Sequence, residues 1–88
     1  MPRKIEIYAT ATCPYCYRAK KLLHAKGVEF AAIDVTGNGE LRAEMARRSG
    51  GRTTVPQIFV DGRYIGDSEA IDALDARGEL DVILGLGR

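Results

Sequence analysis

Cysteine, net charge and long hydrophobic runs are all scarce in this sequence. Two cysteines in 88 residues are too few for the disulfide framework of a small secreted domain. A formal net charge of +1 provides no general attraction to nucleic acid or to a membrane surface. Residues 1–12 lack the apolar core of a signal peptide, and the run at residues 82–84 is far too short to span a bilayer. We therefore expect a cytoplasmic protein that binds neither nucleic acid nor membrane.

No repeat, low-complexity tract or linker interrupts the chain, and we expect one domain over residues 1–88. Hydrophobic periodicity and turn residues predict strands at residues 5–8, 28–35, 55–60 and 63–65. The predicted helices are residues 15–26, residues 40–49, a third from Asp67 or Ser68 to Gly78, and a short tail at residues 80–84. A β-α-β unit makes its strands parallel, whereas a hairpin adds antiparallel strands. The predicted fold class is therefore α/β, in the order β-α-β-α-β-β-α, with a mixed four-stranded sheet flanked by helices.

The two cysteines lie three positions apart, as Cys13 and Cys16, between the first predicted strand and the first predicted helix. A C-x-x-C pair in this position is typical of a thiol–disulfide redox site. The first turn of a helix carries unpaired N–H groups and positive partial charge, which favour the reactive thiolate. With Thr12 as the predicted N-cap, Cys16 falls on the apolar face of the helix, together with Ala19 and Leu23. We therefore expect Cys13 to be the nucleophile and Cys16 to be a buried second thiol.

Two structural roles compete with redox chemistry for the cysteine pair. A structural zinc site needs four ligands, whereas the chain offers two cysteines and His24, which stands among lysines and is expected to be solvated. A structural disulfide would close a very short loop and so contribute little to stability. Redox chemistry is therefore the favoured interpretation, and we expect no metal ligands.

Three motifs together resemble the dithiol glutaredoxins, a branch of the thioredoxin-like proteins. They are Cys-Pro-Tyr-Cys at 13–16, Thr-Val-Pro-Gln-Ile-Phe at 54–59, and Ile65-Gly66 before the last main helix. Bacterial members are also similar at residues 17–20, 48–50 and 73–78, so the resemblance covers essentially the whole chain. It implies a thioredoxin-like fold and a glutathione-dependent disulfide reductase. It also implies a cis Val55-Pro56 peptide facing the active cysteine, whereas the residues alone leave an ordinary trans loop proline open.

The resemblance implies a role for each cysteine and for glutathione. Cys13 attacks a disulfide sulfur and forms a mixed disulfide, which Cys16 resolves. Glutathione is the reducing co-substrate, and no cofactor is bound. The expected partners are disulfide-containing or glutathionylated proteins, and we expect the chain to act as a monomer.

The resemblance also implies where glutathione binds. One of its carboxylates meets the N–H groups of Ser68 and Glu69 at the start of the last main helix, because a helix N-terminus attracts anions. The second carboxylate meets Gln57, with Arg52 as a helper, and Tyr15 flanks the bound peptide. The complete predicted set is Thr10, Tyr15, Thr54, Val55, Pro56, Gln57, Asp67, Ser68 and Glu69.

Three of these positions depart from the pattern common in the family. Thr10 replaces a lysine, Asp67 replaces a second glycine, and Glu69 replaces an aspartate. The first two changes weaken the expected attraction for glutathione carboxylates, although Arg18 adds positive potential nearby. Three alternatives remain open, and the weakened carboxylate contacts favour only the first of them. They are a donor reduced by thioredoxin reductase, an iron–sulfur cluster carrier, and a protein-binding module with a vestigial site.

Overall fold

The computed structural model describes residues 3–86 and contains one sheet with the strand order β2-β1-β3-β4. The strands are β1 (Ile5–Ala9), β2 (Ala31–Asp34), β3 (Gln57–Val60) and β4 (Arg63–Gly66). β2 pairs with β1 in parallel, whereas the β1–β3 and β3–β4 pairs are antiparallel. The predicted α/β class and mixed four-stranded sheet are thus confirmed. The two residues at each end of the expected domain lie outside the described residues.

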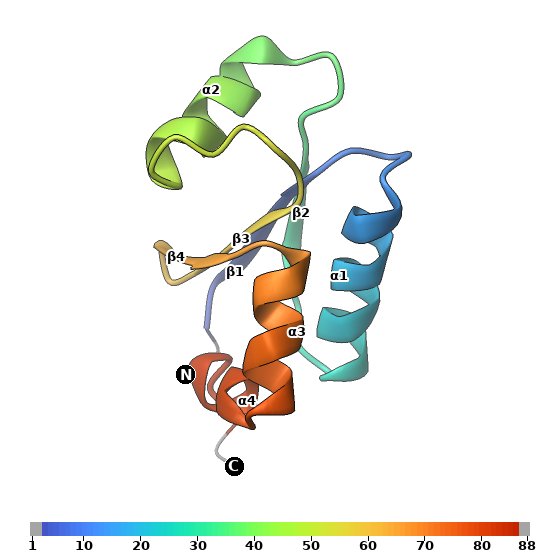
Figure 1. Cartoon of the computed structure of the whole chain (residues 1–88), viewed down its shortest axis with the longest axis vertical. Helices are drawn as coiled ribbons and strands as arrows, with labels where there is room; N and C mark the ends of the chain where they lie inside the picture. Colours follow the sequence, from blue (N-terminus) through green and yellow to red (C-terminus); the bar gives the residue numbers. More distant parts are fainter. Residues whose placement is uncertain (1–2, 87–88) are drawn as a thin grey trace.

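Helices cover both faces of this sheet. They are α1 (Pro14–Ala25), α2 (Gly39–Arg48), α3 (Ser68–Ala76) and α4 (Glu79–Ile83). Figure 1 shows α1 and α3 side by side on one face, with their first turns at the same end, and α2 on the other face. Lys26 follows α1 and forms ion pairs with Asp75 of α3 and Asp81 of α4. The arrangement brings the positive N-terminal ends of α1 and α3 to one end of the molecule.

Alternation along the two central strands divides the core into two layers. Ile7 and Ile58 belong to the apolar cluster beneath α1 and α3. Their neighbours Tyr8 and Phe59 belong to a second cluster, which contains Met45 of α2. Because side chains alternate along a strand, the parity of a residue on β1 or β3 decides which face of the sheet it meets.

β2 and β3 are shorter than the sequence predicts. β2 is an edge strand whose pairing with β1 begins at Ala31, opposite Glu6, so residues 28–30 lie before the paired segment. β3 begins after Pro56, which has no N–H to donate to a ladder. The predicted hairpin is confirmed, because Asp61 and Gly62 have positive φ angles of 51° and 81°. Because β3 begins only at Gln57, the preceding segment lies outside the sheet, and its Val55 lies beside Cys13 at the start of α1.

Candidate active site

The sulfur of Cys13 caps helix α1, whereas the sequence predicts Thr12 as the cap. Cys13 Sγ accepts the N–H of Cys16 at 3.4 Å, as a serine or threonine oxygen does in a more common cap. Pro14 follows at the first helical position, where a missing N–H breaks no bond. Thr12 is exposed and lies one residue before the cap. The reactive atom itself therefore lies at the positive end of α1.

The pKa values of the two thiols move in opposite directions. Burial raises the pKa of Cys13, but the N–H groups of Cys16 and Tyr15 and the Cys16 thiol outweigh it and hold that pKa below its ordinary value. Burial raises the pKa of Cys16, and the N–H of Thr10 reverses only part of that effect. Cys16 is 1% exposed, as its position on the apolar helix face predicts. The site thus combines a thiolate-forming cysteine with a protonated thiol one turn along the same helix.

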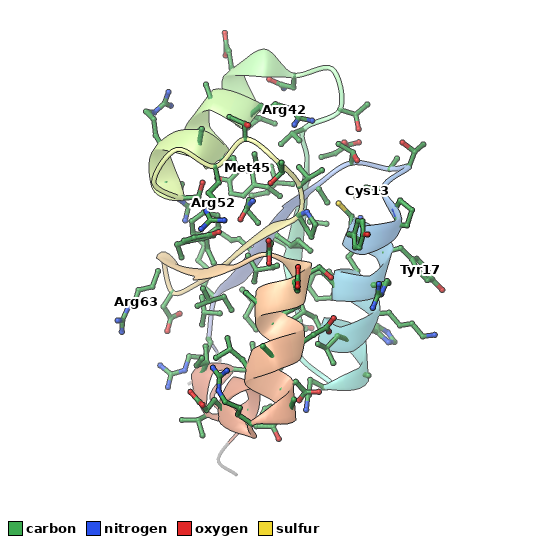
Figure 2. All side chains as sticks on the ribbon, viewed as in Figure 1. Cys13, Tyr17, Arg42, Met45, Arg52 and Arg63 are labelled. Carbon is green, nitrogen blue, oxygen red and sulfur yellow. The ribbon has the colours of Figure 1, made fainter. Side chains whose placement is uncertain are left out.

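A cis peptide joins Val55 to Pro56, as the family resemblance implies. The thiol of Cys13 lies 3.9 Å from the carbonyl oxygen of Val55. Figure 2 shows Cys13 at the first turn of α1, while Tyr17 points outward from the same helix. Pro56 is buried and Val55 is half-buried, so this segment forms a fixed wall beside the sulfur.

A pocket of about 480 Å³ opens beside this wall. Its lining consists of Tyr15, Arg18, Thr54, Val55, Pro56, Asp67, Ser68, Glu69 and Asp72. These residues come from α1, from the segment before β3, and from the start of α3. Gly66 permits the close approach of β4 to α3, because a Cβ on Gly66 would lie 2.4 Å from the Cβ of Ala70.

The first turn of α3 forms one side of the pocket. Asp67 caps this helix, and its Oδ1 accepts the N–H of Ala70 at 2.9 Å. The first N–H groups of a helix have no acceptor within the helix. Those of Ser68 and Glu69 are therefore suited to a bound anion, and the anion site that the family resemblance implies here stays a prediction.

Seven of the nine predicted glutathione contacts line this pocket, whereas Thr10 and Gln57 do not. Gln57 is fully buried on the α2 side of the sheet, because it shares a strand face with Phe59. Its Nε2 donates to the carbonyl oxygen of Thr54 at 3.0 Å, and its Oε1 accepts the hydroxyl of Tyr64 at 2.6 Å. The Gln57 amide is thus engaged inside the fold.

Two charged residues outside the predicted set also line the pocket, namely Arg18 and Asp72. From the sequence we expect Arg18 to be only a general source of positive potential, and Asp72 is not among the predicted residues. Helical spacing indicates that both residues share a face with predicted site residues, because Arg18 follows Tyr15 by three residues and Asp72 follows Ser68 by four.

Arg42 of α2, which the sequence does not single out, contacts the segment before β3. Its Nη1 donates to the carbonyl oxygen of Thr53 at 2.8 Å, in the segment that leads to Val55. Figure 2 shows Arg42 at the end of the molecule where Cys13 lies. The predicted helper, Arg52, is exposed and does not line the pocket. No local pattern points to Arg42, because its contact with the loop is tertiary.

Within residues 3–86, no group of three or more His, Cys, Asp or Glu side chains is arranged to hold a metal ion. Over the same part of the chain, none of the helices has the length and apolar character needed to cross a membrane.

The chain is similar in sequence and in structure to known glutaredoxins. The glutaredoxin family model matches residues 5–65. Glutaredoxin 3 of Escherichia coli K12 is 56% identical over 80 residues, which cover 91% of this chain and 95% of that protein. A Pseudomonas aeruginosa glutaredoxin is 50% identical over 80 residues, covering 91% and 94% of the two chains. The solution structure of a Brucella melitensis glutaredoxin is 47% identical, has a TM-score of 0.82, and covers 97% of this chain and 91% of its own. The chain belongs to the glutaredoxin family and is a glutathione-dependent thiol–disulfide oxidoreductase.

Proposed function

We propose that Cys13 and Cys16 reduce protein disulfides and glutathione mixed disulfides, with glutathione as the electron donor. The observation that carries this proposal is the position of Cys13 Sγ, which caps α1, has a lowered pKa and lies against Val55. The Cys13 thiolate attacks one sulfur of the substrate disulfide. A mixed disulfide with Cys13 forms, and the other substrate sulfur leaves as a thiolate.

The second step differs between the two substrate classes. With a protein disulfide, the Cys16 thiolate attacks the Cys13 sulfur, which releases the reduced protein and leaves a Cys13–Cys16 disulfide for two glutathione molecules to reduce. With a glutathione mixed disulfide, Cys13 takes the glutathione, and a second glutathione thiolate removes it as oxidised glutathione. Burial and the Cys13 charge both raise the pKa of Cys16, so Cys16 gives up its proton more readily once Cys13 is in a mixed disulfide.

In this proposal, glutathione lies along Thr54 and Val55 with its own cysteine beside Cys13. An extended peptide gains affinity from main-chain hydrogen bonds to such a segment. The carboxylate of its γ-glutamyl residue binds the N–H groups of Ser68 and Glu69 at the start of α3.

We propose that the glycine carboxylate, at the other end of glutathione, meets Arg42. With the γ-glutamyl end at α3 and the middle residue beside Cys13, the glycine end lies on the Thr53 side of Val55, away from α3. An extended tripeptide spans about 10 Å, which is long enough for this path. Arg42 donates one N–H to Thr53, and a guanidinium has five, so donors remain for a carboxylate. The buried amide of Gln57 makes this residue a weaker candidate for the same contact.

A donor reduced by thioredoxin reductase is the second candidate. The carboxylates of Asp67 and Glu69 flank the proposed anion site, and Thr10 supplies no cation, which weakens attraction for glutathione. We further propose that the chain acts as one domain and as a monomer in the cytoplasm, where thiols are kept reduced.

NADPH oxidation in two coupled systems separates these candidates. The first contains glutathione, glutathione reductase and a glutathionylated peptide, and the second contains thioredoxin reductase with no glutathione. We expect turnover in the first system and none with Cys13→Ser. Turnover in the second system alone would contradict the proposed electron donor.

A further inference from the structure

The pocket between α1 and α3 extends past the proposed carboxylate site to an ion pair. Arg18 Nη2 and Asp72 Oδ2 are 3.9 Å apart, and both residues line the pocket. Their side chains are 63% and 50% exposed. The Arg18 guanidinium also lies 5.9 Å from the ring centroid of Tyr15. An ion pair this long and this exposed contributes little to stability, but it holds a cation and an anion side by side at the pocket.

We propose that the Arg18–Asp72 pair recognises the charged amino-acid head of glutathione. The γ-glutamyl residue carries its α-carboxylate and its α-ammonium on one carbon atom, so the head presents two opposite charges close together. In the complex, Arg18 faces the carboxylate and Asp72 faces the ammonium. This inference rests on the proposed function, because it takes glutathione to be the ligand of the pocket.

Helix geometry brings both charges of the head within reach of the pair. Asp72 is four residues after Ser68, so it lies one turn further along the same face of α3, about 6 Å away. A carboxylate bound to the N–H groups of Ser68 and Glu69 brings the adjacent ammonium to this face. The guanidinium of Arg18 reaches across from α1, and its planar fork suits a carboxylate.

The charges around the pocket explain why recognition needs both members of the pair. Asp67, Glu69 and Asp72 supply three carboxylates, whereas Arg18 supplies the one guanidinium in the lining. A ligand that presents only carboxylates meets more repulsion than attraction here. An ammonium beside the carboxylate satisfies Asp72 and releases Arg18 for the ligand. Removal of the ammonium should therefore weaken binding to an extent that depends on Asp72.

The test is an equilibrium constant for mixed disulfide formation on Cys13 in the Cys16→Ser protein. The Cys13 thiolate attacks oxidised glutathione, and one glutathione thiolate leaves. Oxidised N-acetylglutathione reacts in the same way, but its amine carries no charge. Intact mass spectrometry at a fixed ratio of thiol to disulfide measures both constants.

We expect a preference for glutathione over N-acetylglutathione of about fivefold, the upper range for exposed charge pairs. Asp72→Asn should remove this preference. Glu29→Gln should keep it, because Glu29 is exposed in the segment between α1 and β2 and does not line the pocket. Arg18→Gln should lower the constant for glutathione more than that for N-acetylglutathione, because the ammonium releases Arg18 from Asp72, and Arg18→Lys should restore part of the loss.

Two results would overturn the inference while leaving the proposed function intact. One is a preference for glutathione that Asp72→Asn leaves unchanged, and the other is a pair of constants that Arg18→Gln does not alter. A Cys13 that forms no mixed disulfide with either compound would instead contradict the proposed function itself.

Discussion

The two faces of the sheet use arginine in opposite ways. On the α2 face, Arg48 donates to the Tyr8 hydroxyl at 2.6 Å and to Glu6 Oε1 at 3.0 Å. Its guanidinium also lies 4.3 Å from the ring centroid of Phe59. On the α1–α3 face, Arg18 meets its carboxylate partner at 3.9 Å and is 63% exposed. Arg48 is therefore engaged in contacts within the fold, whereas the Arg18 guanidinium is accessible to a ligand.

The same contrast extends to the other polar groups of the two faces. The Tyr8 hydroxyl donates to Glu44 and accepts from Arg48, so the α2 face holds a closed network that links α2 to β1. Burial and the bond to Glu44 raise the pKa of Tyr8. The other face collects groups suited to reaction, namely a capping sulfur and the first N–H groups of two helices. Changes to one face should therefore alter stability, and changes to the other should alter activity.

The largest expected effect is on activity alone. Cys13→Ser should abolish the reduction of both substrate classes, because a serine hydroxyl is not a nucleophile at neutral pH without an adjacent base. Stability should be maintained, since a serine oxygen is a favoured N-cap for α1. The coupled assay and a thermal unfolding curve test the two halves. Residual turnover, or a large loss of stability, would contradict this separation.

Cys16→Ser should divide the two activities. The variant should still remove glutathione from mixed disulfides, because Cys13 accepts the glutathione and a second glutathione releases it. It should lose the reduction of protein disulfides, which needs the internal thiol. Rates with a glutathionylated peptide and with a disulfide-bonded protein, measured side by side, show the division. Equal losses with both substrates would show that Cys16 does not resolve the intermediate.

Stability should respond to Arg48 and not to Arg18. Arg48→Met removes the bonds that the largely buried Arg48 donates to Glu6 and Tyr8. It should lower the free energy of unfolding by about 2 kcal/mol. Arg18→Met removes an exposed pair and should cost less than about 0.5 kcal/mol. Urea unfolding of both variants gives the comparison directly. Similar losses for both variants would remove the distinction between the two faces.

A smaller effect is expected from Asp67→Gly at the start of α3. The carboxylate of Asp67 accepts the N–H of Ala70 and repels an incoming glutathione carboxylate. Its removal should lower the glutathione requirement by the equivalent of about 0.5–1 kcal/mol after screening by salt. Replacement of an N-cap by glycine should cost only a few tenths of a kcal/mol. Thr10→Lys should act in the same direction, and both gains should shrink at high salt. A glutathione requirement that Asp67→Gly leaves unchanged at low salt would show that the carboxylate binds elsewhere.

The sequence predicted the features that depend on local spacing. The separation of Cys13 and Cys16 indicated the chemistry, and the helical period placed Cys16 in the core. The motif around Val55 and Pro56, read through its family resemblance, predicted the cis peptide. The sulfur cap was not predicted, because capping preferences are dominated by oxygen side chains such as that of Thr12.

Features that depend on contacts between distant segments were not predicted. Gln57 follows a motif proline, which suggests a place at the site, yet its parity on β3 turns it to the α2 face with Phe59. Arg42 reaches the Thr53 carbonyl only because α2 packs near the segment before β3. The meeting of Arg18 and Asp72 likewise requires α1 and α3 to lie side by side.

The rate of Cys13 alkylation as a function of pH measures the property on which the proposed mechanism depends. Only the thiolate reacts, so the midpoint of the rate profile reports the pKa of Cys13. Peptide mapping by mass spectrometry separates this reaction from that of Cys16, which is buried and has a raised pKa. We expect a Cys13 midpoint clearly below the free-thiol value of about 8.5, with Cys16 largely unmodified. A Cys13 midpoint at or above that value would show that the start of α1 does not favour the thiolate.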